Sequence, residues 1–187
     1  MTTIGSIRAV LLSALVVAGL SGADTVQVVP ALVEPGDTSG FGTGMWKSTP
    51  RQPYLFGDMP VCLDRPGRVM VTNVGFERPR GGIRLEAFAL RPRYTPAYSN
   101  GTGGGEPTTL RRKGIATGPQ PITEVCPPPE EEIPRFAELV VQVSRTGEAT
   151  ASGTALNLTY TSAGHVRTLR IPVEFVICGQ DKAMDCD

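Results

Sequence analysis

The stretch Phe136–Cys178 decides the fold, and it reads FAELVVQVS, RTGEATASG, TALNLTYT, SAGH and VRTLRIPVEFVIC. In its first, third and last segments, apolar residues alternate with polar ones. A period of two is typical of strands with one face in a core and the other in water. We therefore expect a meander of three antiparallel strands. Glu138, Gln142 and Ser144 of the first strand are expected on the side that faces water.

Two earlier stretches show a similar pattern. RVMVTNVGF (residues 68–76) and IRLEAFALRP (residues 83–92) are separated by the polar run ERPRGG (residues 77–82). Two alternating runs joined by a short Gly-containing stretch are typical of a β-hairpin. We therefore expect these two strands to pair with each other.

The region before these strands is less regular. DTVQVVPALV (residues 24–33) predicts a first strand that is broken or bulged at Pro30, because proline has no amide hydrogen to donate. Residues 34–53 are rich in glycine and predict a loop that carries the only tryptophan, Trp46. A tryptophan in a loop is either a contact residue for a partner, since its rigid ring offers a large area, or a cover for one end of the core.

No segment has the period of an amphipathic helix, and six to eight short strands are separated by turns. This pattern predicts an all-β domain over residues 24–187, a two-sheet antiparallel β-sandwich that is immunoglobulin-like in general plan. A long Gly- and Pro-rich insertion at about 92–134 interrupts the strands, and loops of this length usually serve a function or lack order. No motif identifies a particular family.

The insertion contains two runs of charge. Arg111, Arg112 and Lys113 form a basic triplet, and EEE at 130–132 forms an acidic one. Three like charges usually mark a solvated surface, and the two triplets can pair with each other. We nevertheless treat the insertion as the best candidate for a partner-binding surface, because function concentrates in loops held by a rigid scaffold.

The first 23 residues resemble an export signal. Arg8 precedes AVLLSALVVAGL, a run of 12 apolar or small residues, which is shorter than the roughly 20 residues needed to span a bilayer. Small residues at Ser21 and Ala23 fit cleavage after Ala23, so residues 1–23 are predicted to be a signal peptide. The alternative is an uncleaved membrane anchor over residues 4–22, and only in that case do we expect contact with a membrane.

Export agrees with an even number of cysteines, which predicts disulfides in an oxidising compartment. Four cysteines permit three pairings. We favour Cys62–Cys178 with Cys126–Cys186, because an antiparallel pairing of their strands would bring the first two together. The alternative is Cys62–Cys126 with Cys178–Cys186.

Charge and motifs exclude several functional classes. The formal net charge is zero, so no overall field attracts nucleic acid. The charge is nevertheless uneven, since residues 51–113 hold 11 Lys and Arg against 5 Asp and Glu. This excess either complements the acidic second half within the fold or forms a basic face for an acidic partner. No cofactor-binding, metal-binding or nucleophile motif is present, and the only histidine, His165, lies in a turn without a recognisable catalytic partner.

We therefore expect an exported, non-catalytic domain of the cell surface or envelope that binds a protein or a polymer. Trp46, Arg111, Arg112 and Lys113 are the candidate contact residues. The alternatives are a small extracellular hydrolase that uses His165 or clustered carboxylates, and a domain anchored by its N-terminal segment. Three Lys against fifteen Arg indicates GC-rich coding and suggests a bacterial host.

Overall fold

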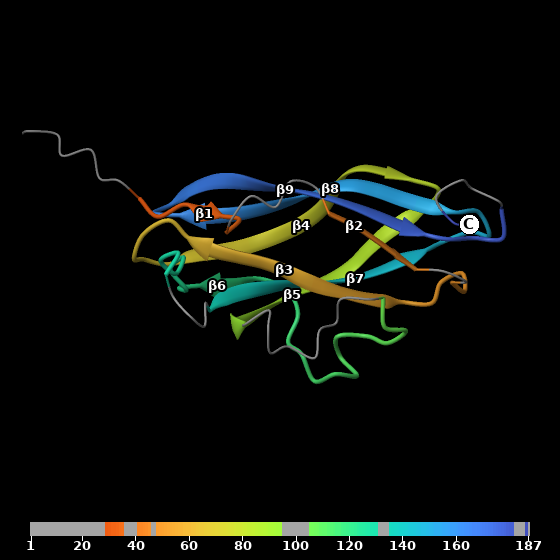
Figure 1. Cartoon of the computed structure of the whole chain (residues 1–187), viewed down its shortest axis with the longest axis horizontal. Coiled ribbons are helices and arrows are strands. Elements are labelled where there is room, and N and C mark those ends of the chain that lie inside the picture. The colour runs from red at the N-terminus through yellow and green to blue at the C-terminus, as the bar shows by residue number, and fades with distance from the viewer. Residues whose placement is uncertain are drawn as a thin grey trace, which may run out of the picture.

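The structure is a computed structural model of the chain, and it describes residues 29–35, 41–45, 48–94, 105–130, 135–181 and 186. These residues form an all-β fold with one antiparallel and one mixed sheet (Figure 1). The strands are β1 (Leu32–Val33), β2 (Phe41–Met45), β3 (Tyr54–Leu63), β4 (Val69–Arg80), β5 (Ile83–Tyr94), β6 (Gln120–Ile122), β7 (Phe136–Arg145), β8 (Ala151–Ser162) and β9 (His165–Ile177). The antiparallel sheet has the order β1-β3-β7-β5, and the mixed sheet has the order β2-β9-β8-β4-β6.

The strands of the predicted meander exist, but they do not form one sheet. β8 and β9 pair along their whole length, and the turn between them has positive φ at Ala163 (46°) and Gly164 (81°). Two such residues suit a tight hairpin, because this turn matches the twist of the strands. β7, however, pairs with β3 and β5 in the other sheet. The prediction of a three-stranded meander was wrong, because alternation reveals which face is buried and not which strand pairs.

The predicted hairpin between β4 and β5 was also wrong. β4 pairs with β8 and β6, whereas β5 pairs with β7 in the opposite sheet. Gly81 and Gly82, both with positive φ, turn the chain from one sheet to the other. A Cβ atom on Gly81 would lie 2.1 Å from the carbonyl oxygen of Thr150, so this crossing requires a glycine.

Residues 34–53, predicted to be a loop, contain strand β2. It runs parallel to β9, with Phe41 opposite Val173 and Met45 opposite Ile177, and it makes the second sheet mixed instead of antiparallel. Its sequence, FGTGM, has two glycines and no alternation, so only the pairing with β9 defines it as a strand. In the predicted first strand, the described residues are paired only at Leu32 and Val33.

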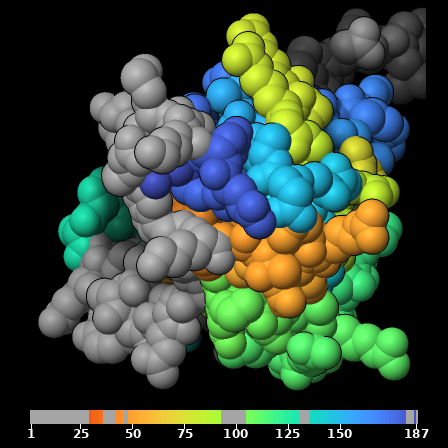
Figure 2. Space-filling model, turned by 90° about the vertical axis from the view of Figure 1, so that its right-hand side faces the viewer, coloured from red at the N-terminus to blue at the C-terminus, as the bar shows by residue number. Residues whose placement is uncertain are grey.

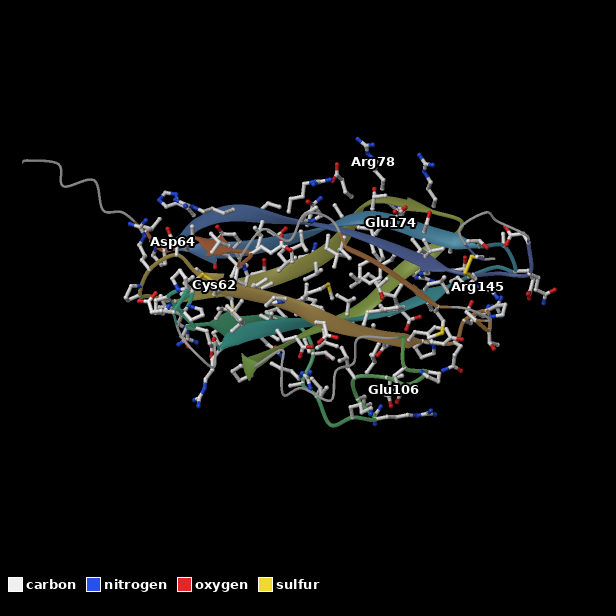
Figure 3. All side chains as sticks on the ribbon, in the orientation of Figure 1. Cys62, Asp64, Arg78, Glu106, Arg145 and Glu174 are labelled. Atoms are coloured by element: carbon white, nitrogen blue, oxygen red, sulfur yellow. A yellow bond between two sulfur atoms is a disulfide. The ribbon has the colours of Figure 1, made fainter. Side chains whose placement is uncertain are left out.

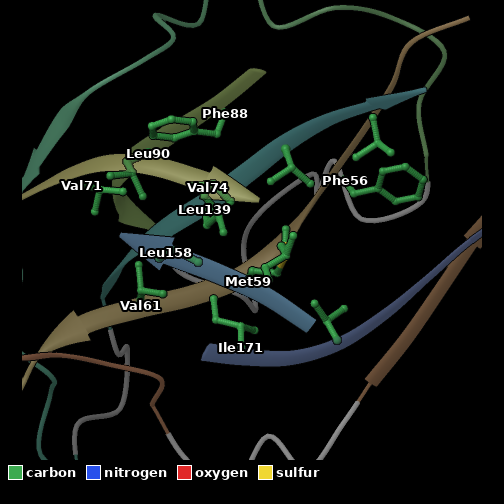
Figure 4. Close-up of a cluster of buried hydrophobic side chains, with 14 of the residues drawn as sticks. Phe56, Met59, Val61, Val71, Val74, Phe88, Leu90, Leu139, Leu158 and Ile171 are labelled. Carbon is green, nitrogen blue, oxygen red and sulfur yellow. The ribbon is translucent and has the colours of Figure 1, made fainter. Parts of the chain in front are cut away.

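The two sheets share one core (Figure 4). Leu139 and Phe56 of the first sheet and Leu158 and Phe175 of the second are all buried. The rings of Phe56 and Phe175 meet edge to face at 5.2 Å, an arrangement that aromatic pairs favour. Each large side chain buried in this way contributes about 1.5–3 kcal/mol relative to exposure.

The disulfides are Cys62–Cys126 and Cys178–Cys186, so our favoured pairing was wrong and the alternative is confirmed. Cys62 lies in β3 of one sheet, one residue before the strand ends, whereas Cys178 follows β9 of the other sheet. The antiparallel pairing that we assumed therefore does not occur. Two disulfides indicate an oxidising setting. Within the described ranges, no helix is long and apolar enough to cross a membrane, and the predicted signal segment lies outside them.

Candidate functional site

Residues 105–126, which we call the strap, run along the outer face of the four-stranded sheet (Figure 1). The amide of Leu55 in β3 donates to the carbonyl of Glu106 at 2.9 Å. The amide of Leu110 donates to the side-chain oxygen of Gln142 in β7 at 3.0 Å. Residues 106–110 of the predicted insertion are therefore attached to the sheet through both backbone and side chain.

A second apolar cluster fixes the strap to the sheet. Leu110 is fully buried against Leu55, Ala89 and Val140, and Ile115 packs against the same group. These residues form a cluster separate from the main core between the sheets. The strap thus gives the four-stranded sheet a buried outer face.

The prediction that the polar face of β7 is solvated was wrong, because β3, β5 and the strap all contact it. Glu138 and Ser144 are buried, with 0% and 2% exposure, and Gln142 is half-buried. Glu138 accepts hydrogen bonds from the amide of Asp58 at 2.9 Å and from the guanidinium of Arg91. The alternating pattern of β7 could not reveal this, because its polar side contacts protein partners in place of water.

Residues 109–114 of the strap form a single turn, which we call the basic turn. The hydroxyl of Thr109 accepts a hydrogen bond from the amide of Arg112 at 3.1 Å, and its carbonyl accepts one from the amide of Lys113 at 3.2 Å. Gly114 closes the turn with a φ of 71°. Because the backbone of the turn is internally bonded and Leu110 is buried beneath it, the exposed Arg111 and Arg112 project from a fixed base.

The charges of the basic turn are only partly neutralised. The ammonium of Lys113 lies 2.6 Å from the carboxylate of Glu106, within the strap. The predicted pairing with residues 130–132 stays a prediction, because only Glu130 of that run is described. Among the described residues, neither Arg111 nor Arg112 forms an ion pair. The two exposed guanidinium groups therefore have no carboxylate partner within the described ranges.

The far end of the strap is also held. The side-chain oxygen of Gln120 accepts a hydrogen bond from the amide of Leu90 at 2.6 Å, and β6 pairs with β4. The amide of Cys126 donates to the carbonyl of Leu63 at 2.9 Å, beside the disulfide to Cys62. The strap therefore joins the edges of the two sheets, which places the basic turn on a rigid support.

A buried arginine, which sequence reasoning missed, organises one end of the molecule (Figure 3). The guanidinium of Arg145 donates to the hydroxyl and the carbonyl of Ser48, both at 2.7 Å, and to the carbonyl of Gly147. The hydroxyl of Ser48 in turn donates to the carbonyl of Cys178 at 2.6 Å. Arg145 thereby ties together three chain segments. Its position at the end of β7, next to a polar turn, gave no signal of burial.

The structure does not bring the other candidate residues, Trp46 and His165, together in one site within the described part of the chain. Trp46 lies outside the described residues. His165 is exposed at the start of β9, and Ser162, its partner across the hairpin, donates its hydroxyl to the carbonyl of Pro30 at 2.6 Å. The hydroxyl of Ser162 is therefore engaged with the backbone and not with the imidazole. No group of three or more His, Cys, Asp or Glu side chains suited to a metal ion occurs within the described ranges.

Two surface carboxylates, those of Asp64 and Asp181, have a pKa lowered by hydrogen bonds. The hydrogen bond from Arg65, helped by the amide of Ala31, lowers the pKa of Asp64. The hydroxyl and amide of Thr150 lower the pKa of Asp181. A carboxylate whose ionised form is stabilised in this way stays charged to lower pH and cannot serve as a proton donor near neutrality.

The strongest candidate site is therefore the basic turn on its strap, a surface suited to binding an anionic group. Arginine offers two parallel hydrogen bonds to a carboxylate or phosphate, which favours such ligands. No protein-family model, curated protein or solved structure matches the chain.

Proposed function

We propose that the chain is an exported, non-catalytic domain that binds an acidic protein or cell-envelope polymer through its basic turn. The observation that carries this proposal is the exposure of Arg111 and Arg112 on a turn held by the buried Leu110. A rigid support favours binding, because less conformational entropy is lost when the ligand arrives.

The strand order supports an immunoglobulin-like sandwich as the scaffold. In such sandwiches, one sheet has the order A-B-E-D and the other contains G-F-C. The order β1-β3-β7-β5 corresponds to the first, and β9-β8-β4 corresponds to the second. β2, parallel to β9, is an additional edge strand. Domains of this plan commonly bind through loops and edges while the sheets stay rigid.

The distribution of charge supports an acidic partner. Residues 51–113 carry the excess of positive charge, and the basic turn lies at the end of this range. Figure 2 shows the green residues of the strap at the bottom of one end of the molecule, open to solvent. A local excess of arginine attracts anionic partners and accelerates their association, most strongly at low ionic strength.

The engagement of the polar groups supports a non-catalytic domain. The carboxylate of Glu138 is bound by an amide and a guanidinium, and that of Glu86 accepts hydrogen bonds from Gln142 at 2.7 Å and Ser144 at 2.6 Å. The carboxylates of Glu138 and Glu86 therefore bond to groups on neighbouring strands of the same sheet. A hydrolase would need a carboxylate or imidazole directed at a substrate.

A charge-reversal experiment tests this function. The Arg111→Glu/Arg112→Glu variant and wild type are immobilised and exposed to an envelope extract of the host, and the retained material is quantified. The matched control is Arg68→Glu/Arg167→Glu, which makes the same charge change at two other exposed positions. We expect the first variant to lose the retained material and the control to keep it. Equal retention by all three proteins would overturn the role of the basic turn.

Export is tested separately by N-terminal sequencing of the protein recovered from the host. If residues 1–23 are a signal peptide, the mature chain starts at Asp24. A chain that starts at Met1 and fractionates with membranes would instead establish the anchored alternative. Either result leaves the test of the basic turn intact, because that test uses the folded domain.

A further inference from the structure

One edge of the five-stranded sheet is only partly covered. β4 pairs with β8 from Met70 to Arg80, but on its other side it pairs with β6 only from Val69 to Val71. In the described part of the chain, no strand pairs with this side of β4 beyond Val71. The neighbouring β5 pairs as a strand only with β7, and the strap bonds to its other edge at Phe88 and Leu90. Free strand edges present unpaired amides and carbonyls that can pair with another chain.

A groove of about 270 Å³ lies between these two edges. Its lining mixes apolar and polar side chains from β4, β5 and the strap. The lining residues are Asn73, Val74, Leu85, Glu86, Ala87, Phe88, Thr117 and Gly118. The groove can therefore accept an apolar side chain from a segment that lies along the free edge of β4.

The rims of the groove carry positive charge. Arg78, Arg80 and Arg84 are exposed near the turn between β4 and β5, and Figure 3 shows Arg78 pointing away from the sheets. In Figure 2, this yellow-green region projects at the top of the end view. The nearby carboxylates are already engaged: Glu77 pairs with Arg170 at 2.6 Å, and Glu86 accepts two hydrogen bonds from β7. Glu77 also lies 3.9 Å from Arg78, and among the described residues neither Arg80 nor Arg84 forms an ion pair.

We propose that this groove binds an extended, acidic segment of a partner protein, which adds as a strand to the free edge of β4. In strand addition, main-chain hydrogen bonds supply affinity and pockets for alternate side chains supply specificity. β6 already occupies the first part of the edge, and an added strand would continue from it. An added strand has the same rise of about 3.3 Å per residue, so the edge from Asn73 to Arg80 accommodates about eight residues.

The charge of the rims selects the acidic segment over a second copy of this chain. Pairing two β4 edges would bring two sets of Arg78, Arg80 and Arg84 together, and like charges across strands are unfavourable. An acidic strand instead gains ion pairs at the same positions. The site is separate from the basic turn, so this proposal does not depend on the proposed function.

Peptide binding tests the proposal. The probes are a fluorescent hexapeptide of alternating Val and Glu, its Val and Lys counterpart, and a Val and Glu peptide with N-methylated amides that cannot complete the ladder. Anisotropy titrations use wild type, Arg78→Glu/Arg80→Glu, Thr117→Trp and the control Arg167→Glu. Thr117 is exposed at the end of the groove, so the tryptophan fills the groove without entering the core. Hydrogen exchange of residues 73–78 is measured with and without peptide.

We expect the Val and Glu peptide to bind at least about tenfold more tightly than the other two peptides, because ion pairs and ladder hydrogen bonds both contribute. The Arg78→Glu/Arg80→Glu and Thr117→Trp variants should each weaken its binding by about tenfold, whereas Arg167→Glu should not. Amides of residues 73–78 should become protected. Absence of binding at millimolar peptide, equal binding of the acidic and basic peptides, or binding without that protection would overturn the proposal. A concentration-dependent dimer that excludes the peptide would establish a second copy as the occupant.

Discussion

Replacing Leu110 by alanine is the sharpest test of how the strap is held. Leu110 is fully buried in a small cluster with Leu55, Ala89 and Val140, outside the main core. If this cluster fixes the strap to the sheet, Leu110→Ala should destabilise the whole domain. The strap is also tied by β6 and the Cys62–Cys126 disulfide, so it should not detach independently.

The magnitude follows from the buried atoms. Leu110→Ala removes three buried carbon atoms, which at about 0.8 kcal/mol each gives about 2.4 kcal/mol. A residual cavity raises this cost, and measured Leu→Ala changes in cores span about 2–5 kcal/mol. Because the strap lies at the surface and can partly collapse onto the sheet, we expect a loss of about 2–3 kcal/mol in the free energy of unfolding.

Urea unfolding measures this loss, and hydrogen exchange at the Leu110 amide shows whether the strap opens alone. The control is Val166→Ala, because Val166 is 71% exposed and its truncation should change the free energy of unfolding by less than about 0.5 kcal/mol. A Leu110→Ala loss no larger than that of the control would refute the reasoning. So would rapid exchange of the Leu110 amide in the wild-type protein, because it would mean that the strap is open in the folded domain.

Three further predictions concern other parts of the fold. Arg145→Met should lower the free energy of unfolding by about 3 kcal/mol, because it leaves buried carbonyls without a donor; a loss below about 1 kcal/mol in urea would show that the network is dispensable. Hydrogen bonds lower the pKa of Asp64 and Asp181, so their contribution to stability is present above an unfolded-state pKa of about 3.9 and lost as pH falls through the lower folded-state pKa. Urea titrations between about pH 7 and pH 2 should show this loss, and Asp64→Asn should reduce it; an unchanged acid dependence would contradict the assignment. Cys126→Ser, which opens a disulfide with a sequence separation of 64, should cost about 4 kcal/mol, and Cys186→Ser, with a separation of 8, about 2.6 kcal/mol. Thermal and urea unfolding rank the two, and the reverse order would contradict the loop-entropy account.

Local patterns predicted the strands, but the contacts between strands required the structure. The β8–β9 hairpin was foreseeable because alternation and the turn Ala163-Gly164 lie within one continuous stretch. The sequence pattern does not show that the chain changes sheet after β7, because strands of both sheets bury apolar side chains with the same alternation. β2 was missed for a related reason: its glycines carry no pattern, and its strand character comes from the parallel pairing with β9.

The candidate site was predicted in part. The basic triplet was identified from charge alone, and the structure places Arg111 and Arg112 in solvent. Its support was not foreseen, because Leu110 is one leucine in a polar stretch and its partners come from three distant strands. Glu138 was predicted to face water because a polar strand face that is covered by protein shows the same alternation as one that is exposed to solvent. The preference for Cys62–Cys178 failed because it assumed a strand pairing that does not occur.

An equilibrium titration of the partner recovered from the envelope extract tests the central claim most directly. Its affinity is compared between wild type, Arg111→Glu/Arg112→Glu and the control Arg68→Glu/Arg167→Glu at two salt concentrations. The account predicts that reversing the two arginines weakens binding by at least about tenfold at low salt, that the control stays close to wild type, and that added salt narrows the difference. An affinity of Arg111→Glu/Arg112→Glu equal to that of the control would contradict the assignment of the basic turn as the binding surface.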